Sequence, residues 1–156
     1  MQRAEEVSKA KKIRGRVRRY LPLLFWMGLI FSASTGEFSA SNTSLIVRPL
    51  LLWLFPDISE ERIALAHFLV RKAAHFTEYA VLGLLMARAF TSSSHATLRH
   101  RWFAVSLLLI AVYALTDEFH QSFVASRTAS VFDSMIDTAG GLTALLLYRR
   151  RRRRSL

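Results

Sequence analysis

The sequence of 156 residues contains no cysteine, six glycines and three prolines. The absence of cysteine excludes disulfides, cysteine zinc sites and thiol catalysis within this sequence. Acidic residues are also scarce, since 11 Asp and Glu stand against 22 Lys and Arg and give a formal net charge of +11. Hydrophobic residues nevertheless make up 52% of the chain, so the basic and apolar parts must be separated along the sequence.

The positive charge is concentrated at the two ends of the chain. Residues 1–20 and Arg149–Arg154 together carry +12, which leaves −1 of the total for residues 21–148. Both basic segments lie directly against long apolar stretches, as the cytoplasmic Lys and Arg of membrane proteins do. We therefore expect basic cytoplasmic tails at 1–19 and 149–156 that contact anionic lipid headgroups, and no nucleic-acid binding.

The apolar stretches predict an all-α, polytopic membrane protein with a transmembrane domain at residues 20–148. Four spans are expected, at 20–34, 58–90, 102–115 and 131–148. The segment Leu45–Phe55 is too short to span and carries Arg48 and Pro49, which is typical of an amphipathic or re-entrant segment. Arginines beside the 91–101 loop place that loop and both termini in the cytoplasm. A cleavable signal peptide is the alternative interpretation of the first span.

Several helix ends and contacts are also predicted. Pro22 is expected in the first turn of a helix that begins near Tyr20, where its missing N–H has no helical partner. Asp57 followed by Glu60 resembles a capping box and predicts a helix from Ile58 to about Phe90. Glycines in the later spans are expected where helices approach closely, namely at Gly83, Gly140 and Gly141.

The polar residues of the expected spans fall in one layer. Arg71, His75 and Glu78 share one helix face, and Glu78 lies ten residues, about 15 Å, before Arg88. By the same measure the LTDEFHQSF stretch, 115–123, brings its ionisable groups near the outer boundary, and Asp133 and Asp137 share a face of the last span. Charged groups near the bilayer centre are costly, so these side chains must face one another or a polar pocket that opens outward.

The charges of this layer do not balance without a proton or a cation. Five acids (Glu78, Asp117, Glu118, Asp133 and Asp137) oppose two arginines (Arg71 and Arg127), with His75 and His120 titratable. Lys72 is expected to turn elsewhere. At least one acid must therefore stay protonated in a dry pocket unless a cation binds.

Two segments of the chain resemble the VanZ-like family of small bacterial membrane proteins. They are RKAAHFTEYAVLGLL at 71–85 and YALTDEFHQSFVASRTASVFDSMIDTAGG at 113–141, with FSASTGEFS following the first span. The sequence departs from the family pattern at Ala125-Ser126, where Pro-Gly is common, and at Asp137, where Asn is usual. The resemblance implies a multi-pass protein of the bacterial cytoplasmic membrane, and the founding member is linked to low-level teicoplanin resistance.

Together the residues and the resemblance predict an outward-facing site for a lipid-linked or cell-envelope ligand. One hypothesis is a membrane-embedded hydrolase or transferase; the alternatives are a non-enzymatic binding or accessory protein and a proton-coupled carrier. The predicted catalytic residues, which would transfer protons, are His75, Glu78, Asp117, Glu118 and His120. The predicted substrate-binding residues are Arg71, Gln121, Arg127, Asp133 and Asp137.

A divalent metal is a further alternative. His75-x-x-Glu78 and Asp117-x-x-His120 each place a carboxylate and an imidazole on one helix face, as inward-facing sites of helix bundles do. These four residues form the predicted metal-ligand set.

Overall fold

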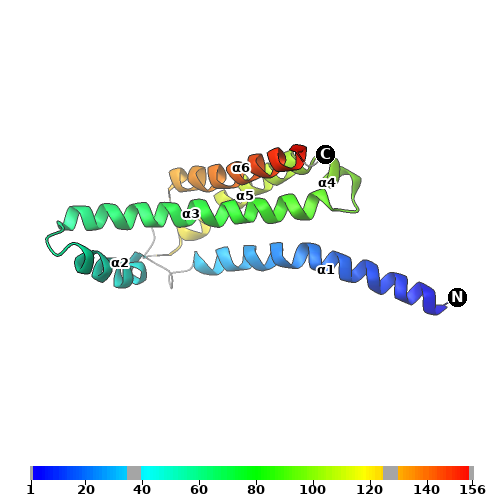
Figure 1. The fold of residues 1–156 in the computed structure, drawn as a ribbon, viewed down its shortest axis with the longest axis horizontal. Helices are drawn as coiled ribbons and strands as arrows, with labels where there is room; N and C mark the ends of the chain where they lie inside the picture. Colours follow the sequence, from blue (N-terminus) through cyan, green and yellow to red (C-terminus); the bar gives the residue numbers. More distant parts are fainter. Residues whose placement is uncertain (1, 35–39, 125–129, 155–156) are drawn as a thin grey trace.

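The structure is a computed structural model that describes residues 2–34, 40–124 and 130–154. In these residues it contains helices and no strand (Figure 1). The elements are α1 (Gln2–Ala33), α2 (Ala40–Leu54), α3 (Glu60–Thr91), α4 (Ala96–His100), α5 (Trp102–Gln121) and α6 (Val131–Arg154). The prediction of an all-α fold is confirmed.

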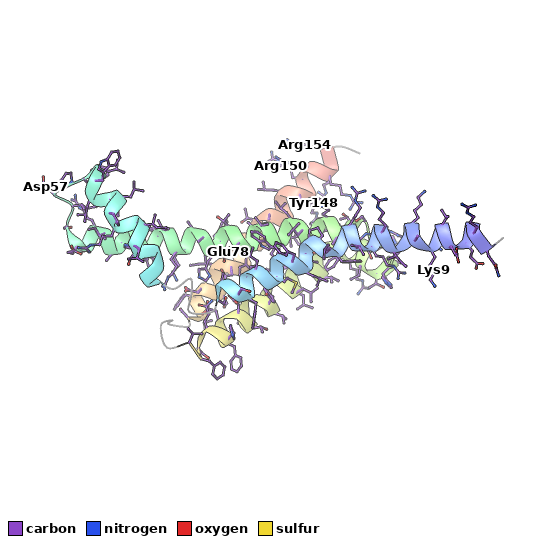
Figure 2. All side chains as sticks on the ribbon, turned by 90° about the horizontal axis from the view of Figure 1, so that it is seen from below. Lys9, Asp57, Glu78, Tyr148, Arg150 and Arg154 are labelled. Carbon is purple, nitrogen blue, oxygen red and sulfur yellow. The ribbon has the colours of Figure 1, made fainter. Side chains whose placement is uncertain are left out.

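The four long helices run alternately in opposite directions. Both chain ends and α4 lie at one end of the molecule, whereas α2 and the connection to α3 lie at the other (Figure 1). Figure 2 shows Lys9, Arg150 and Arg154 toward the first end, Asp57 at the opposite end and Glu78 between them. The basic residues of the two termini are thus gathered on one side of the bundle.

The first helix is longer than predicted. α1 includes both the basic residues 2–19 and the apolar stretch after them, so Pro22 lies inside the helix and not in its first turn. The prediction for Pro22 was wrong because Lys, Arg and Ala are good helix formers and continue the helix toward the N-terminus. One missing backbone hydrogen bond is the local cost of this proline.

The start of α3 also differs from the prediction. The N-cap is Ser59, whose Oγ accepts a hydrogen bond from the Arg62 N–H, and not Asp57. Asp57 lies inside a turn that is closed by the bond from Ile58 N–H to Phe55 O (3.1 Å). The Arg48 guanidinium of α2 forms two 2.6 Å bonds with the Glu60 carboxylate at the start of α3, so this ion pair joins the two helices across the turn.

The core lies where α3, α5 and α6 meet. α3 packs most extensively against α6, and a Cβ at Gly140 would lie 2.2 Å from Phe76 O, which shows how closely the backbones approach. A Cβ at Gly83 would lie 2.8 Å from Gly141 O, and one at Gly141 would lie 2.7 Å from Ile110 of α5. The predicted close-packing role of all three glycines is confirmed.

The outer faces of the helices are apolar. Large exposed hydrophobic side chains lie on every long helix and include Leu24, Phe25, Phe68, Leu108, Phe119 and Leu147. Of the described helices, α5 (Trp102–Gln121) is long and apolar enough to cross a bilayer. The part of α2 from Ser44 to Leu54 is a shorter apolar segment. The other long helices carry charges within or beside their apolar stretches.

Candidate functional site

Polar side chains from α3, α5 and α6 meet in the interior with that of Ser34, the residue that follows α1. We call this group the polar cluster. It consists of Ser34, Lys72, His75, Asp117, Glu118, Gln121, Asp133 and Asp137. All of these side chains are buried except that of Lys72, which is half-buried. Close packing at Gly140, one turn after Asp137 in α6, brings α6 against α3 next to His75.

The centre of the polar cluster is formed by one residue from each of three helices. His75 of α3 contacts Asp137 of α6, with Nδ1 and Oδ1 3.2 Å apart. His75, Asp137 and Glu118 of α5 each offer one ligand atom, and these atoms lie within 4.8 Å of one another. Glu118 is oriented because its Oε2 accepts the Ser130 N–H at 2.7 Å. An imidazole and two carboxylates are thus in reach of one small ligand.

Asp117 belongs to a second group, at the end of α1. Its Oδ1 accepts a short hydrogen bond from Ser34 Oγ, and its Oδ2 accepts one from Gln121 Nε2 at 3.1 Å. Gln121 also donates to Ser34 Oγ at 3.4 Å. Oδ1 of Asp117 therefore joins α5 to the end of α1, while Oδ2 is held by Gln121 of the same helix, so both oxygens are occupied by packing contacts.

Lys72 was predicted to turn away from the site. Its side chain instead reaches into the polar cluster. Its Nζ forms a close ion pair with Asp133 Oδ1 in the first turn of α6, and it lies 5.1 Å from the centre of the Phe68 ring. The prediction was wrong because Lys72 precedes His75 by three residues and so lies on an adjacent part of the helix surface. Its long side chain reaches the buried carboxylate, which needs a counter-charge.

The remaining predicted residues are placed as follows. Glu78 is half-buried one turn after His75, and Arg71 is half-buried on α3 one turn before it. His120 is turned toward α1, where its ring stacks on Phe31 with centroids 4.4 Å apart. Its Nδ1 is buried and has no hydrogen-bond partner in the described part of the chain. Arg127 lies outside the described residues.

The predicted metal-ligand set is replaced by a different grouping. Of His75, Glu78, Asp117 and His120, only His75 is in the one group of three ligands found among residues 2–34, 40–124 and 130–154. Spacing along a helix identifies residues that share a face but not the direction in which that face points. α5 is rotated so that Glu118 faces the centre while Asp117 and His120 face α1.

Two residues near the site were not predicted from the sequence. Ser34 closes the cluster from α1, and a small polar residue at the end of an apolar stretch is the signal that could have identified it. Tyr79 of α3 is fully buried, and its hydroxyl is without a hydrogen-bond partner among the described residues. An aromatic residue in an apolar helix gives no such signal.

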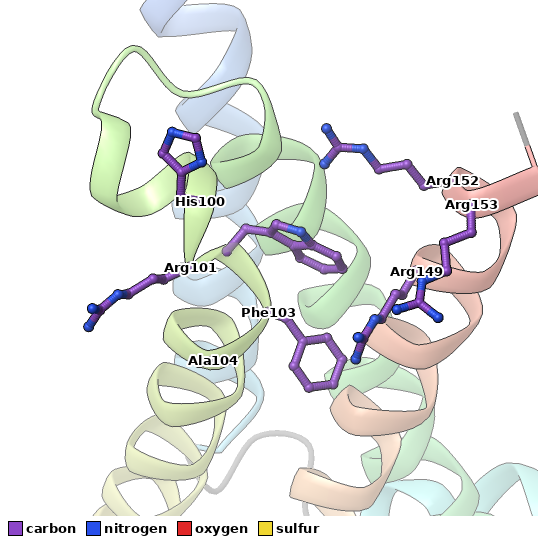
Figure 3. Close-up of a pocket in the computed structure, with 8 residues that line it drawn as sticks. His100, Arg101, Phe103, Ala104, Arg149, Arg152 and Arg153 are labelled. Atoms are coloured by element: carbon purple, nitrogen blue, oxygen red, sulfur yellow. The ribbon is translucent and has the colours of Figure 1, made fainter. Parts of the chain in front are cut away.

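A separate hollow lies at the basic end of the bundle, between the start of α5 and the end of α6 (Figure 3). Its volume is about 380 Å³. It is lined by His100, Arg101, Trp102, Phe103, Ala104, Arg149, Arg152 and Arg153. The Arg149 guanidinium lies 5.4 Å from the centre of the Phe103 ring, so cationic and aromatic groups are mixed in this pocket.

A family model described as VanZ/LLP1 matches residues 19–152. The chain belongs to the VanZ/LLP1 family. The match includes every helix except the basic first part of α1 and the last arginines, so the whole polar cluster lies inside the VanZ/LLP1 region. No curated protein and no solved structure matches the chain. The resemblance seen in the sequence is confirmed at the level of the family.

Proposed function

We propose that this VanZ/LLP1 protein is a multi-pass protein of the bacterial cytoplasmic membrane. We further propose that its polar cluster binds and transforms a lipid-linked or cell-envelope substrate at the outer leaflet, in a role linked to teicoplanin resistance. The observation that carries the proposal is the buried contact of His75 with Asp137 beside Glu118.

This arrangement suits proton transfer. If the Nδ1–H of His75 donates to Asp137, the carboxylate fixes the ring and its tautomer and leaves Nε2 available either as an acid or base or as the donor to a bound cation. Glu118 keeps one oxygen, Oε1, without a partner among the described residues and so has an acceptor available for a substrate. Arg71 and Arg127 are the proposed binding groups for an anionic substrate.

The membrane arrangement is supported by charge and surface. Basic residues gather at one end of the bundle, and four long helices with apolar outer faces run alternately between the ends (Figures 1 and 2). Positive charge marks the cytoplasmic side of membrane proteins. In this orientation α1, α3, α5 and α6 cross the bilayer, both termini are cytoplasmic, and the polar cluster lies in the outer half.

The proposal predicts that His75→Gln and Glu118→Gln abolish function without loss of folded protein. Purified protein is incubated with bacterial lipid extract, and the lipids are compared by mass spectrometry. We expect the wild type to convert a lipid-linked species and each variant to be slowed by about 100-fold or more, because general acid–base catalysis contributes at least this much. His67→Gln, a second histidine of α3, is the matched control and should retain activity.

The same variants are compared in a teicoplanin-sensitive bacterium. Expression of the wild type and of His67→Gln should reduce sensitivity to teicoplanin, whereas His75→Gln and Glu118→Gln should not. If the protein retains a lipid but does not convert it, the protein is a lipid-binding protein and not an enzyme. If all forms leave both the lipids and the sensitivity unchanged, the proposed function is wrong.

We also propose that the hollow between the start of α5 and the end of α6, which we call the basic pocket, binds the headgroup of an anionic phospholipid. Arg149, Arg152 and Arg153 line this pocket, whereas Arg150, Arg151 and Arg154 of the same run do not (Figure 3). Arginine binds phosphate through paired, charge-assisted hydrogen bonds, and a pocket between two helices holds the headgroup more firmly than a charged surface does.

Replacing the three pocket arginines by Gln is therefore expected to weaken phosphatidylglycerol binding more than replacing the other three. Both triple variants lose about 1 kcal/mol of surface attraction per arginine. The pocket variant also loses direct bonds to the phosphate, and the difference should be roughly tenfold or more in affinity. Retained lipid is measured by native mass spectrometry, with phosphatidylcholine as the neutral reference. Equal losses in the two variants would show that only the total charge matters.

A further inference from the structure

The donor atoms at the centre of the polar cluster are arranged as metal ligands are. His75, Glu118 and Asp137 come from three different helices, and all three are buried. Three atoms bound to one Zn²⁺ at about 2.1 Å each lie at most about 3.6 Å from one another. The three donor atoms lie within 4.8 Å of one another, so movements of up to about 0.7 Å by each atom complete the site.

Unused acceptors form the second observation. Glu118 Oε1 and Asp137 Oδ2 are buried oxygens with no hydrogen-bond partner in the part of the chain that the structure describes. Asp137 is fully buried, and Glu118 is 6% exposed. Buried carboxylate oxygens are normally paired, because leaving one unpaired costs free energy. Two unpaired oxygens beside one histidine point to a ligand that accepts electron pairs from both.

Within residues 2–34, 40–124 and 130–154, the charged groups that contact the polar cluster do not supply this ligand. Lys72, on the same face of α3 as His75, is held by Asp133. The Ser130 N–H occupies the other oxygen of Glu118, and the His75 ring contacts only one oxygen of Asp137. Such contacts orient metal-binding carboxylates and leave their second oxygen available. A divalent cation would balance the two carboxylates, whereas a single proton would leave one of them unpaired.

We propose that His75, Glu118 and Asp137 bind one divalent transition-metal ion of the Zn²⁺ or Mn²⁺ class. An imidazole with two carboxylates suits these ions better than Mg²⁺ or Ca²⁺, which prefer oxygen ligands alone. Three protein ligands leave a coordination position open, as in catalytic zinc sites, where a water molecule or an anionic oxygen of the substrate binds. Asp117 and His120 are not ligands, since they face α1.

The test measures metal binding alone, without lipid, so that its outcome is separate from that of the proposed function. The full chain is purified in detergent, stripped with a chelator and titrated calorimetrically with Zn²⁺, Mn²⁺ or Mg²⁺. We expect one Zn²⁺ or Mn²⁺ per chain and much weaker binding of Mg²⁺. Glu118→Gln and Asp137→Asn should each weaken the binding by at least about 10- to 100-fold, which is the loss seen when even a supporting residue is removed.

His67→Gln is the control, and it should bind the ion as the wild type does. Co²⁺ added to the unmodified protein gives a measurement that does not depend on the folding of any variant. Visible absorption bands of low-symmetry Co²⁺ with a nitrogen ligand are expected at one equivalent, and they should disappear when Zn²⁺ is added. Absence of a stoichiometric ion, or equal binding by Asp137→Asn and the wild type, would overturn the proposal.

Discussion

Gly140→Ala should destabilise the protein more than Gly83→Ala or Gly141→Ala. A Cβ at this position would lie 2.2 Å from Phe76 O and 3.1 Å from Phe76 Cα, so α3 and α6 must move apart. Both nearest groups are backbone, and a change of rotamer cannot relieve the overlap. Overpacking of this kind costs about 3 kcal/mol at the upper end of its usual range. The expected result is a clear loss of thermal stability in detergent, measured by fluorescence-detected size exclusion.

The matched control is Gly28→Ala in α1. A Cβ there would meet no atom within 4 Å, so the change adds a methyl group in open space. Alanine is the better helix former by about 1 kcal/mol, and this variant should be as stable as the wild type or more stable. Because Gly140 is one turn from Asp137, Gly140→Ala should also separate Asp137 from His75 and weaken metal binding. Equal stability of the two variants would show that α3 and α6 are farther apart.

Lys72→Met should be the most damaging change of a single charge. Its partner Asp133 is buried, with 5% of its side chain exposed against 16% for Lys72. Removal of the cation leaves a buried carboxylate without a counter-charge, which costs about 3–5 kcal/mol. Thermal unfolding of the purified variant measures this loss.

A double variant separates the ion pair from other effects of Lys72. Lys72→Met with Asp133→Asn removes both charges, so most of the lost stability should return. Arg48→Met is the exposed counterpart, because its pair with Glu60 lies at the surface. Surface pairs contribute little, and this variant should unfold as the wild type does. If the double variant were as unstable as Lys72→Met, the ion pair would not be the cause.

Helix positions and close packing could be predicted from the sequence because they depend on local patterns. Runs of apolar residues identified the long helices, and Gly83, Gly140 and Gly141 identified the places where backbones meet. The start of α3 was harder to predict, because Asp57 and Ser59 are both good capping residues and lie only two positions apart. The turn closed by Phe55 decides between them, and that turn depends on backbone geometry.

Six residues of the polar cluster were among the residues predicted from the sequence, but their grouping was not predicted. Spacing placed Asp117 and Glu118 in one layer with His75 and Asp137, yet one residue along a helix is a rotation of about 100°. The rotation of α5 against its neighbours is fixed by Ile110 against Gly141 and by Ser34 against Asp117, which are contacts between segments far apart in sequence. For the same reason Lys72 was assigned to the wrong direction.

The close approach of α3 and α6 has a consequence for biosynthesis. Phe76 meets Gly140, which is translated 64 residues later, so the tightest interface cannot form until α6 has been synthesised and has left the ribosome. Until then Lys72 and His75 remain in a nascent chain without their partners from α6. Truncation before residue 131 should therefore leave α3 without its main packing partner and leave Lys72 without its counter-charge.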